Sequence, residues 1–479
     1  MRHERTALGE CLLLLAETST KPARARRVGR ESARGHASHL SKLVLEIPAS
    51  RHKLRLLCWA ETATSMSDDS RGINLMHHAA NGSCLCLNGI CIKGIHVFGR
   101  TVAGCETSQR SFLNRLAKLK LDCCVQASIR ESDSQPCVEF RLREEFAHEW
   151  APGGDTTQLC ERLQLDTVSN PADLEREILL AMLVSPIPIE FPSDAELMAA
   201  VRMRQRIVEA ARKTALSFAT NSAERPIEDW DYDEDRGGFL IRPDRSLIDA
   251  LRKATQPDSS GTLYSFSCYR ATEYVIALAI AEEAEAGNPE LLAQLQRQAE
   301  HRAVRSGEFH RVFCREHGSR AEPLPLRYFV PGDRTWFRNP DCHSSDASGY
   351  EGSWVFYLGN CRFSNFWKRD REFTLTTKCL EMFHWRHATF RDAQGDLRIN
   401  EAIVEERVNA SLQNPTEVAL ILGQMERLYD PAGVYADGGC IDISRESPRW
   451  VCPGTTDLIL PDVLASHRDN FALTELTSL

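Results

Sequence analysis

Apolar residues recur at helical spacing in residues 191–219. Leu197 and Val201 begin a series of apolar positions three or four residues apart, with charged residues between them, which is typical of an amphipathic helix. Ser193 precedes the series, and Glu196 lies three residues after Ser193. This is the spacing of a capping box at a helix N-terminus. The pattern predicts a helix that packs one face against a core.

A second helix is predicted over residues 272–286, whose first half is almost entirely apolar. An apolar segment of this kind indicates a deeply buried helix. Gly287, followed by an Asn-Pro pair, ends it. Ser265 or Ser267 can cap its start, which leaves Cys268 in the first turn.

Two segments further on favour strands. Residues 326–341 and 349–367 are rich in aromatic and β-branched residues, interrupted by Gly and Pro, and this composition is typical of antiparallel strands. Helices therefore precede a sheet along the chain. This order predicts an α+β fold in which a helix headed by Cys268 packs on an antiparallel sheet.

The ends of the chain have a different texture. We expect an irregular, Cys- and Arg-rich extension over residues 1–160, a catalytic domain over 161–395, and a helical and loop-rich extension over 396–479. Within the first part, residues 82–100 predict a hairpin with Asn88-Gly89 in its turn. We expect the N-terminal extension to be dispensable for chemistry.

Charge and cysteine content narrow the class of protein. The chain has 479 residues, 17 cysteines and a net charge of -9. Residues 1–56 carry twelve Lys/Arg and five Asp/Glu, a net of +7; a solvated tail explains this basic arm more simply than a nucleic-acid partner. No segment reaches the roughly 18 apolar residues of a membrane helix. We therefore expect a cytoplasmic protein with reduced thiols, which binds neither membrane nor nucleic acid.

Cys268 is the candidate nucleophile. A thiol in the first turn of a helix faces unpaired backbone N–H groups and the positive end of the helix dipole, which stabilise the thiolate and lower the thiol pKa. The buried helix after it holds the sulfur rigidly. On position alone, a functional thiol and a buried structural thiol are both open readings.

Five stretches, in order, resemble a known family: ILLAMLVSPIPIEFPSDAELMAAVRMRQRIVEAA, GGFLIRPDRSLIDAL, LYSFSCYRATEYVIALA, PGDRTWFRNPD and EGSWVFYLGN. Between about Glu177 and Arg371 the chain resembles the bacterial, spore-coat type of protein-glutamine gamma-glutamyltransferase (transglutaminase). The family's nucleophilic cysteine falls on Cys268. The resemblance implies a small papain-like (NlpC-type) α+β core with its site in a tunnel, independence of calcium, and no metal or other cofactor.

The usual partners of that cysteine are missing. Where the family has a glutamate before the nucleophile, this chain has Ser267. The family's partner glutamate aligns with Ser353, and its histidine aligns near Phe366. A thiol without a base is a poor acyl-transfer catalyst, because the thiol must be deprotonated and the leaving group protonated.

Three other side chains are candidates to replace these partners. Glu351 lies two residues before Ser353, so on a strand it points to the same face. His384 and His387 follow the predicted strands and can return an imidazole to the thiol. The alternative for this pair is a solvated turn or, together with Cys379, part of a metal site, although no fourth ligand can be named. We therefore predict no metal.

Four residues are candidates to bind substrate. Asn365 can orient an imidazole or bind the substrate amide, and Trp354 can line a tunnel. Ser267 and Ser353 occupy the positions of the family's glutamates. Each also has a simpler structural explanation, as a cap, a core aromatic residue or a strand residue.

We expect a cysteine acyltransferase that acts on protein substrates. Cys268 attacks a protein glutamine, and a lysine amine resolves the thioester to an isopeptide bond, or water resolves it to glutamate. Two alternatives stay open. One is a papain-like cysteine peptidase or amidase, and the other is a catalytically inactive relative that acts as a protein-binding module.

Overall fold

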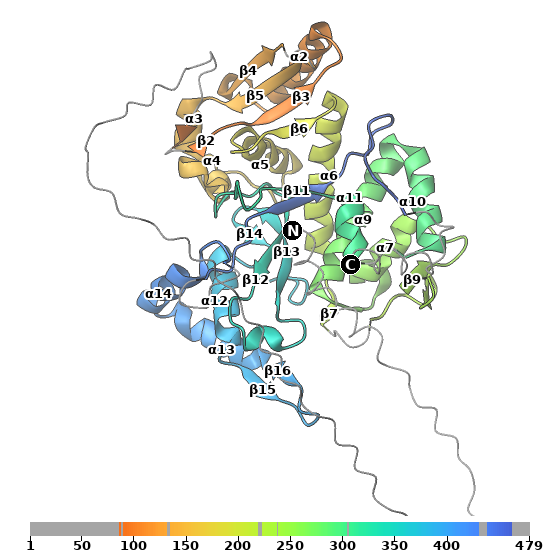
Figure 1. Ribbon diagram of the computed structural model, residues 1–479, viewed down its shortest axis with the longest axis vertical. Helices are drawn as coiled ribbons and strands as arrows, with labels where there is room; N and C mark the ends of the chain where they lie inside the picture. Colours follow the sequence, from red (N-terminus) through yellow and green to blue (C-terminus); the bar gives the residue numbers. More distant parts are fainter. Residues whose placement is uncertain are drawn as a thin grey trace, which may run out of the picture. The chain divides into compact units, whose positions relative to one another are not determined.

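The computed structural model describes residues 86–87, 90–131, 135–218, 223–236, 238–303, 306–430 and 438–461, all in one compact unit. The basic arm and the Asn88-Gly89 turn lie outside these residues. Figure 1 shows the element order. No described helix combines the length and the apolar composition needed to cross a membrane.

Helices make up most of the regular structure (Figure 1). The longer ones are α2 (Val102–Lys118), α5 (Pro171–Leu183), α6 (Asp194–Lys213), α7 (Leu247–Thr255), α9 (Cys268–Gly287), α10 (Pro289–His301), α11 (Ser306–Phe313), α12 (Leu375–Trp385), α13 (Glu401–Leu412) and α14 (Pro415–Met425). The shorter ones are α3 (Glu144–Trp150), α4 (Leu159–Leu163) and α8 (Pro257–Ser260). The two helices predicted around residues 191–219 and 272–286 are thus confirmed as α6 and α9.

The start of α6 differs from a full capping box. The Ser193 hydroxyl accepts the Glu196 backbone N–H at 3.2 Å, as expected. The Glu196 carboxylate, however, accepts the Cys452 backbone N–H and the Thr455 hydroxyl, both at 2.7 Å. The capping-box prediction is therefore half wrong: this buried carboxylate anchors a C-terminal loop onto α6.

A four-stranded sheet contains much of the N-terminal region. Its order is β4-β5-β3-β6. The strands are β3 (Ile95–Phe98), β4 (Val125–Arg130), β5 (Cys137–Leu142) and β6 (Ile189–Phe191). β3, α2 and β4 form a split βαβ unit, with β5 inserted antiparallel between the two strands, and β6 runs parallel to β3. The described part of the N-terminal region is therefore regular, unlike the irregular texture expected from the sequence.

A five-stranded antiparallel sheet has the order β11-β17-β12-β13-β14. Its strands are β11 (Cys314–His317), β12 (Arg334–Arg338), β13 (Gly352–Gly359), β14 (Arg362–Phe363) and β17 (Arg445–Pro448). The predicted antiparallel strands are confirmed as β12, β13 and β14. β17 was not predicted, because its sequence, Arg-Glu-Ser-Pro, has no apolar alternation although every residue in it is buried.

Short strand pairs complete the fold. They are β1 (Cys86–Leu87) with β2 (Ile90–Cys91), β7 (Ser217–Phe218) with β10 (Ser265–Phe266), β8 (Trp230–Asp233) with β9 (Gly238–Ile241), and β15 (Thr389–Arg391) with β16 (Leu397–Ile399). The β1–β2 pair is antiparallel, as the predicted hairpin requires. β7 and β10 are parallel, and β10 leads directly into α9.

Strand β13 separates two hydrophobic cores. Val355 and Tyr357 point into one core, and Phe356 and Leu358 into the other, as the period of two along a strand requires. One core has members from residue 92 to residue 451, and the second from residue 329 to residue 441. The domain boundaries at 160 and 395 stay predictions, and both are crossed by a continuous core.

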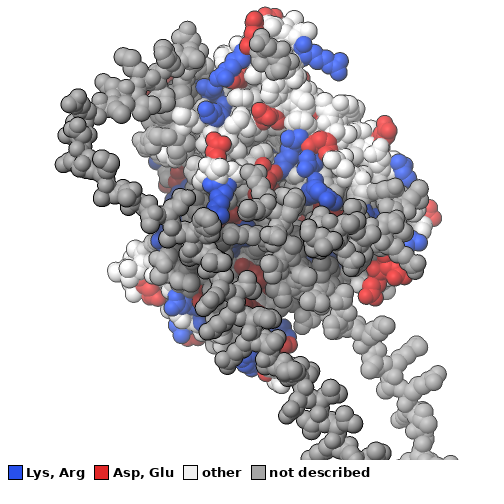
Figure 2. Space-filling model, viewed as in Figure 1, with Lys and Arg blue, Asp and Glu red and all other residues white. Residues whose placement is uncertain are grey.

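The charged residues of the described surface are mixed. Figure 2 shows Lys and Arg interspersed with Asp and Glu over the described part of one face. In this view no broad area of the described surface has a single sign of charge.

Candidate active site

Cys268 is the first residue of α9. The Ser267 hydroxyl caps this helix by accepting the Arg270 backbone N–H at 3.3 Å, so Ser267 serves the helix rather than pointing freely at a substrate. Helix α9 packs against α6, α7 and β13. Residues on nearly all of its sides are therefore buried. The helix therefore holds the thiol at a fixed position beside the start of β13.

Four neighbours act on the charge of the Cys268 sulfur, in addition to burial. The backbone N–H groups of Trp354 and Tyr269 and the charge of Lys378 favour the thiolate, whereas burial and the charge of Glu351 disfavour it. Burial is the largest of these effects, so the thiol pKa is raised. The sequence predicted a lowered pKa for Cys268 because of its place at the helix terminus, and this prediction is wrong. Because its pKa is raised, the thiol needs a base to become a nucleophile.

The charge of Glu351 acts on the Cys268 thiol and disfavours the thiolate. The Glu351 carboxylate accepts the Gly349 backbone N–H at 3.3 Å. Burial raises the carboxyl pKa despite this bond. A partly desolvated carboxyl group thus lies just before β13, and its part in the chemistry stays a prediction.

Lys378 is a residue of the site that the sequence prediction missed. It lies on α12 with a side chain that is only 3% exposed. Its ammonium group pairs with Glu381 at 2.6 Å and lies 4.1 Å from the ring centroid of Phe373. The sequence did contain a signal for this residue. Lys378 lies between Leu375 and Met382, two buried apolar residues of α12, so it interrupts the apolar stripe of that helix. Lys378 is the cation whose charge opposes that of Glu351 at the thiol.

Aromatic rings lie beside Glu351. The Tyr350 ring contacts the Trp385 ring at 5.1 Å and the Phe218 ring at 6.0 Å. Phe218 in turn contacts Trp367 at 5.0 Å, and its side chain is partly exposed. These rings form an apolar wall from the residue next to Glu351 toward the surface.

The other sequence-predicted binding residues have structural partners. The Asn365 amide donates to the Arg371 carbonyl at 2.8 Å and so closes a loop. The Trp354 ring stacks on Trp336 at 5.1 Å, so its backbone rather than its ring faces the thiol. Ser353 lies half-buried on β13, paired in register with Phe337.

His384 and His387 face away from the thiol. His384 Nε2 lies 2.8 Å from the Ser411 hydroxyl, which donates to Glu417 at 3.0 Å. His384 Nδ1 lies 3.2 Å from His387 Nδ1. These partners come from α13 and α14, so the pair packs one end of α12 against other helices. The structure thus does not bring either imidazole to Cys268.

The family model for protein-glutamine gamma-glutamyltransferase matches residues 156–431, more than half of the chain. The chain belongs to this family. It is also 28% identical over 218 residues to a protein-glutamine gamma-glutamyltransferase of Halalkalibacterium halodurans, covering 44% of this chain and 70% of that protein. A solved transglutaminase from Geobacillus stearothermophilus, without its C-terminal extension, is 20% identical with a TM-score of 0.29, covering 45% of this chain and 98% of that one. That structural likeness is too low to carry an argument.

The resemblance seen in the sequence is therefore confirmed: this is a bacterial-type transglutaminase. The matched range contains Cys268, Glu351 and Lys378. It begins after the split βαβ unit, whose last strand ends at Leu142. The described N-terminal elements of this transglutaminase thus lie outside the part that the family model matches.

One group in the described residues has ligand spacing suited to a metal. His96, Cys137 and Glu139 bring three possible ligand atoms within 4.8 Å of one another. The two oxygens of Glu139, however, each lie 2.7 Å from a guanidinium nitrogen, one of Arg130 and one of Arg141. The two guanidinium groups balance the charge of the buried Glu139 carboxylate without a metal ion, so we assign no metal to this group.

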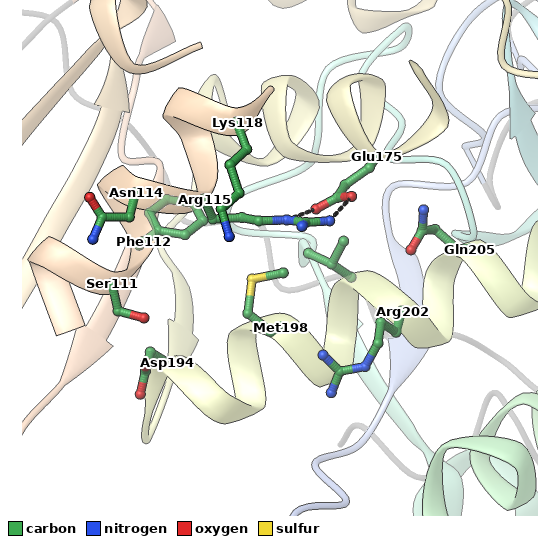
Figure 3. Close-up of a pocket in the computed structure, with 11 residues that line it drawn as sticks. Ser111, Phe112, Asn114, Arg115, Lys118, Glu175, Asp194, Met198, Arg202 and Gln205 are labelled. Carbon is green, nitrogen blue, oxygen red and sulfur yellow. Dashed lines mark hydrogen bonds and ion pairs between the residues drawn. The ribbon is translucent and has the colours of Figure 1, made fainter. Parts of the chain in front are cut away.

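A cavity of about 520 Å³ lies elsewhere in this transglutaminase, between α2, α5 and α6. Figure 3 shows Arg115 reaching across it to Glu175, with Met198 at its base. The Arg115 Nε donates to Glu175 at 2.6 Å. None of the residues predicted for the site from the sequence lines this cavity.

The buried imidazole of His384 predicts that acid destabilises this transglutaminase. Burial, followed by the neighbouring His387 and Arg407, lowers the His384 pKa to about 4, against about 6.5 for an unperturbed histidine. The unfolded chain binds the proton first, so the free energy of unfolding falls as pH drops from about 6.5 to about 4, by at most about 3 kcal/mol. Urea unfolding of the wild type across this pH range measures the loss.

The histidine variant isolates that contribution. His384→Gln keeps a polar group at the position and is expected to show a shallower loss of stability between pH 6.5 and 4. His343→Gln, at an exposed position, is the matched control and should follow the wild type. An unchanged pH dependence in His384→Gln would contradict the assignment.

Proposed function

We propose that this chain forms isopeptide bonds between protein glutamine and lysine side chains, with Cys268 as the nucleophile. The observation that carries the proposal is the position of its sulfur at the head of a buried helix, where backbone N–H groups and the charge of Lys378 favour the thiolate. A nucleophilic cysteine needs such an activating environment. Family membership supplies the reaction class.

The chemistry follows in two steps. The thiol gives its proton to Glu351, and the sulfur attacks the carbonyl carbon of a glutamine carboxamide. The C–N bond then breaks, Glu351 returns the proton to the leaving nitrogen, and ammonia departs from a thioester. The ε-amine of a lysine attacks that thioester and gives a proton to Glu351; the S–C bond breaks, and Glu351 returns the proton to the departing thiolate. Water in place of the amine gives glutamate by the same proton transfers.

A papain-like core is the arrangement that we propose for the site. It is supported by a nucleophile at a helix N-terminus packed on an antiparallel sheet through β13. The backbone N–H of Cys268 is the first of α9 and has no partner within the helix, whereas that of Arg270 is capped by Ser267, so the Cys268 N–H is the natural donor to the oxyanion of a tetrahedral intermediate. The mechanism requires no metal or cofactor.

Glu351 replaces the base that the family pattern carries elsewhere. Its raised carboxyl pKa brings it closer to the operating pH, which suits a group that must both accept and return a proton. The charge of Glu351 disfavours the Cys268 thiolate, whereas the positive charge of Lys378 stabilises the thiolate once it has formed. The aromatic wall from Tyr350 to Phe218 suits the long aliphatic stem of a glutamine or lysine side chain.

Amine incorporation tests the proposed reaction. The chain is incubated with a glutaminyl peptide and a fluorescent primary amine, and the labelled peptide and free ammonia are measured. We expect label in the peptide. Ammonia release without any label at saturating amine would instead indicate an amidase.

The role of Glu351 has its own test. Glu351→Gln keeps the size of the side chain but cannot take the proton, and kcat/KM for amine incorporation should fall by about 10²–10⁴-fold, as for loss of a general acid/base. Glu322→Gln, at an exposed position, is the matched control and should stay within about twofold, as surface substitutions do. A loss below about tenfold in Glu351→Gln would exclude Glu351 as the base.

A further inference from the structure

Arg334 is wholly buried against the helix that carries Cys268. This residue of β12 has a side chain with 0% exposure. Its Nη1 donates to Glu446 of β17 at 2.7 Å, and its Nε donates to the Thr272 hydroxyl of α9 at 2.9 Å. One side chain thus ties together β12, β17 and the helix that carries Cys268.

The guanidinium group also contacts two aromatic rings. Its carbon lies 4.0 Å from the ring centroid of Trp354 and 4.5 Å from that of Tyr269. The two rings meet edge to face at 5.5 Å. Cation–π contacts of this kind are strongest where water is excluded, so Arg334 fixes the relative position of the two rings.

Tyr269 follows Cys268 directly in the first turn of α9, and Trp354 lies on β13, which packs against α9. The backbone N–H groups of both residues favour the Cys268 thiolate. The Thr272 hydroxyl that accepts from Arg334 donates to the Tyr269 carbonyl at 2.7 Å. Arg334 therefore contacts the rings of both residues, and it reaches the Tyr269 carbonyl through the Thr272 hydroxyl. It touches neither the thiol nor a substrate in any contact that the described residues make.

Stability alone explains this arrangement poorly. Replacing a buried ion pair by packed apolar residues is often neutral or stabilising, so a buried ion pair is weak evidence of a stabilising role. The planar guanidinium of Arg334 stacks on aromatic rings and hydrogen-bonds to α9 and β17 at the same time. A lysine ammonium group cannot make this combination of contacts. Resting on the function proposed above, we propose that Arg334 is a positioning residue, which holds Trp354, Tyr269 and the first turn of α9 and so fixes the position of Cys268.

The test compares two Arg→Lys variants of the full chain. Arg334→Lys keeps a positive charge for Glu446 but loses the planar stack. Arg338→Lys is the matched control, because Arg338 lies on the same strand, 3.9 Å over the Trp336 ring, and pairs with Asp442 at 3.0 Å. Four quantities are measured: the iodoacetamide alkylation rate of Cys268 against pH, resolved by peptide mass, then kcat, KM and the melting temperature.

We expect Arg334→Lys to lower the alkylation rate and kcat by about tenfold or more, with KM little changed, because small misplacements of reacting groups are costly. The pH profile of alkylation should shift upward, and the melting temperature should change little. Arg338→Lys should stay within about twofold of the wild type in both rates. A variant Arg334→Lys that changes only the melting temperature would overturn the inference.

A second variant covers the case in which Arg334→Lys does not fold. Thr272→Val removes the acceptor of the Arg334 Nε and leaves the Glu446 ion pair intact. It should slow alkylation in the same direction by a smaller factor, and an unchanged rate would overturn the inference. If Cys268 of the wild type does not react with iodoacetamide at all, both the proposed function and this inference are wrong. If Cys268 reacts in the wild type and equally fast in Arg334→Lys, only this inference is wrong.

Discussion

Replacing Cys268 by alanine is expected to abolish amine incorporation. Without the sulfur no acyl-enzyme can form, and loss of a covalent nucleophile costs at least about 10³-fold in kcat. The fold should persist, because Cys268 is only half-buried and its helix is held by the apolar residues that follow. Incorporation of a fluorescent amine into a glutaminyl peptide measures the first effect, and thermal unfolding measures the second.

The control for this variant is another cysteine. Cys342 is exposed and free, so Cys342→Ala removes an accessible thiol that the proposed mechanism does not use. It should keep wild-type activity. Wild-type activity in Cys268→Ala, or a comparable loss in Cys342→Ala, would contradict the assignment of the nucleophile.

Removing the chain before Thr157 is expected to prevent folding. The truncation deletes β3, β4 and β5, and β6 then loses β3, its partner in the sheet. It also uncovers α5, which packs on β5 through buried residues such as Leu179 and Met182. Each large apolar side chain so exposed costs about 1.5–3 kcal/mol, and several exceed the roughly 5–15 kcal/mol that stabilise a folded domain.

Circular dichroism and urea unfolding of the truncated chain measure this effect. A chain beginning at Cys84 keeps every described element and is the matched control, expected to unfold cooperatively. The sequence alone led to the opposite expectation, that the N-terminal extension is dispensable. A cooperative transition and wild-type turnover in the chain beginning at Thr157 would restore that earlier expectation.

The sequence predicted the elements whose own pattern determines them. α6 and α9 each carry a cap and an apolar stripe or core, and both begin where the capping serine indicates. β13 reads as a continuous apolar strand because it faces a core on each side. Glu351 stays a predicted base: its charge acts on the Cys268 thiol, although β13 begins one residue after it, at Gly352.

Contacts between distant segments could not be predicted in this way. The strand β17 consists of buried polar residues whose partners, such as Arg334, lie far away in sequence. Lys378 and His384 occupy the same helix, yet only Lys378 acts on the thiol, because the rotation of α12 about its axis is set by packing. The thiol pKa was misjudged for the same reason: the helix terminus is visible in the sequence, and the degree of burial is not.

The acyl group is expected on Cys268, and trapping the acyl-enzyme shows whether it is there. The chain is mixed with a glutaminyl peptide in the absence of any amine, quenched in acid to preserve the thioester, digested, and examined by mass spectrometry. The peptide containing Cys268 should gain the mass of the substrate less ammonia, and the adduct should disappear when amine is added before the quench. An adduct on another residue, or turnover without any adduct on Cys268, would show that Cys268 is not the nucleophile.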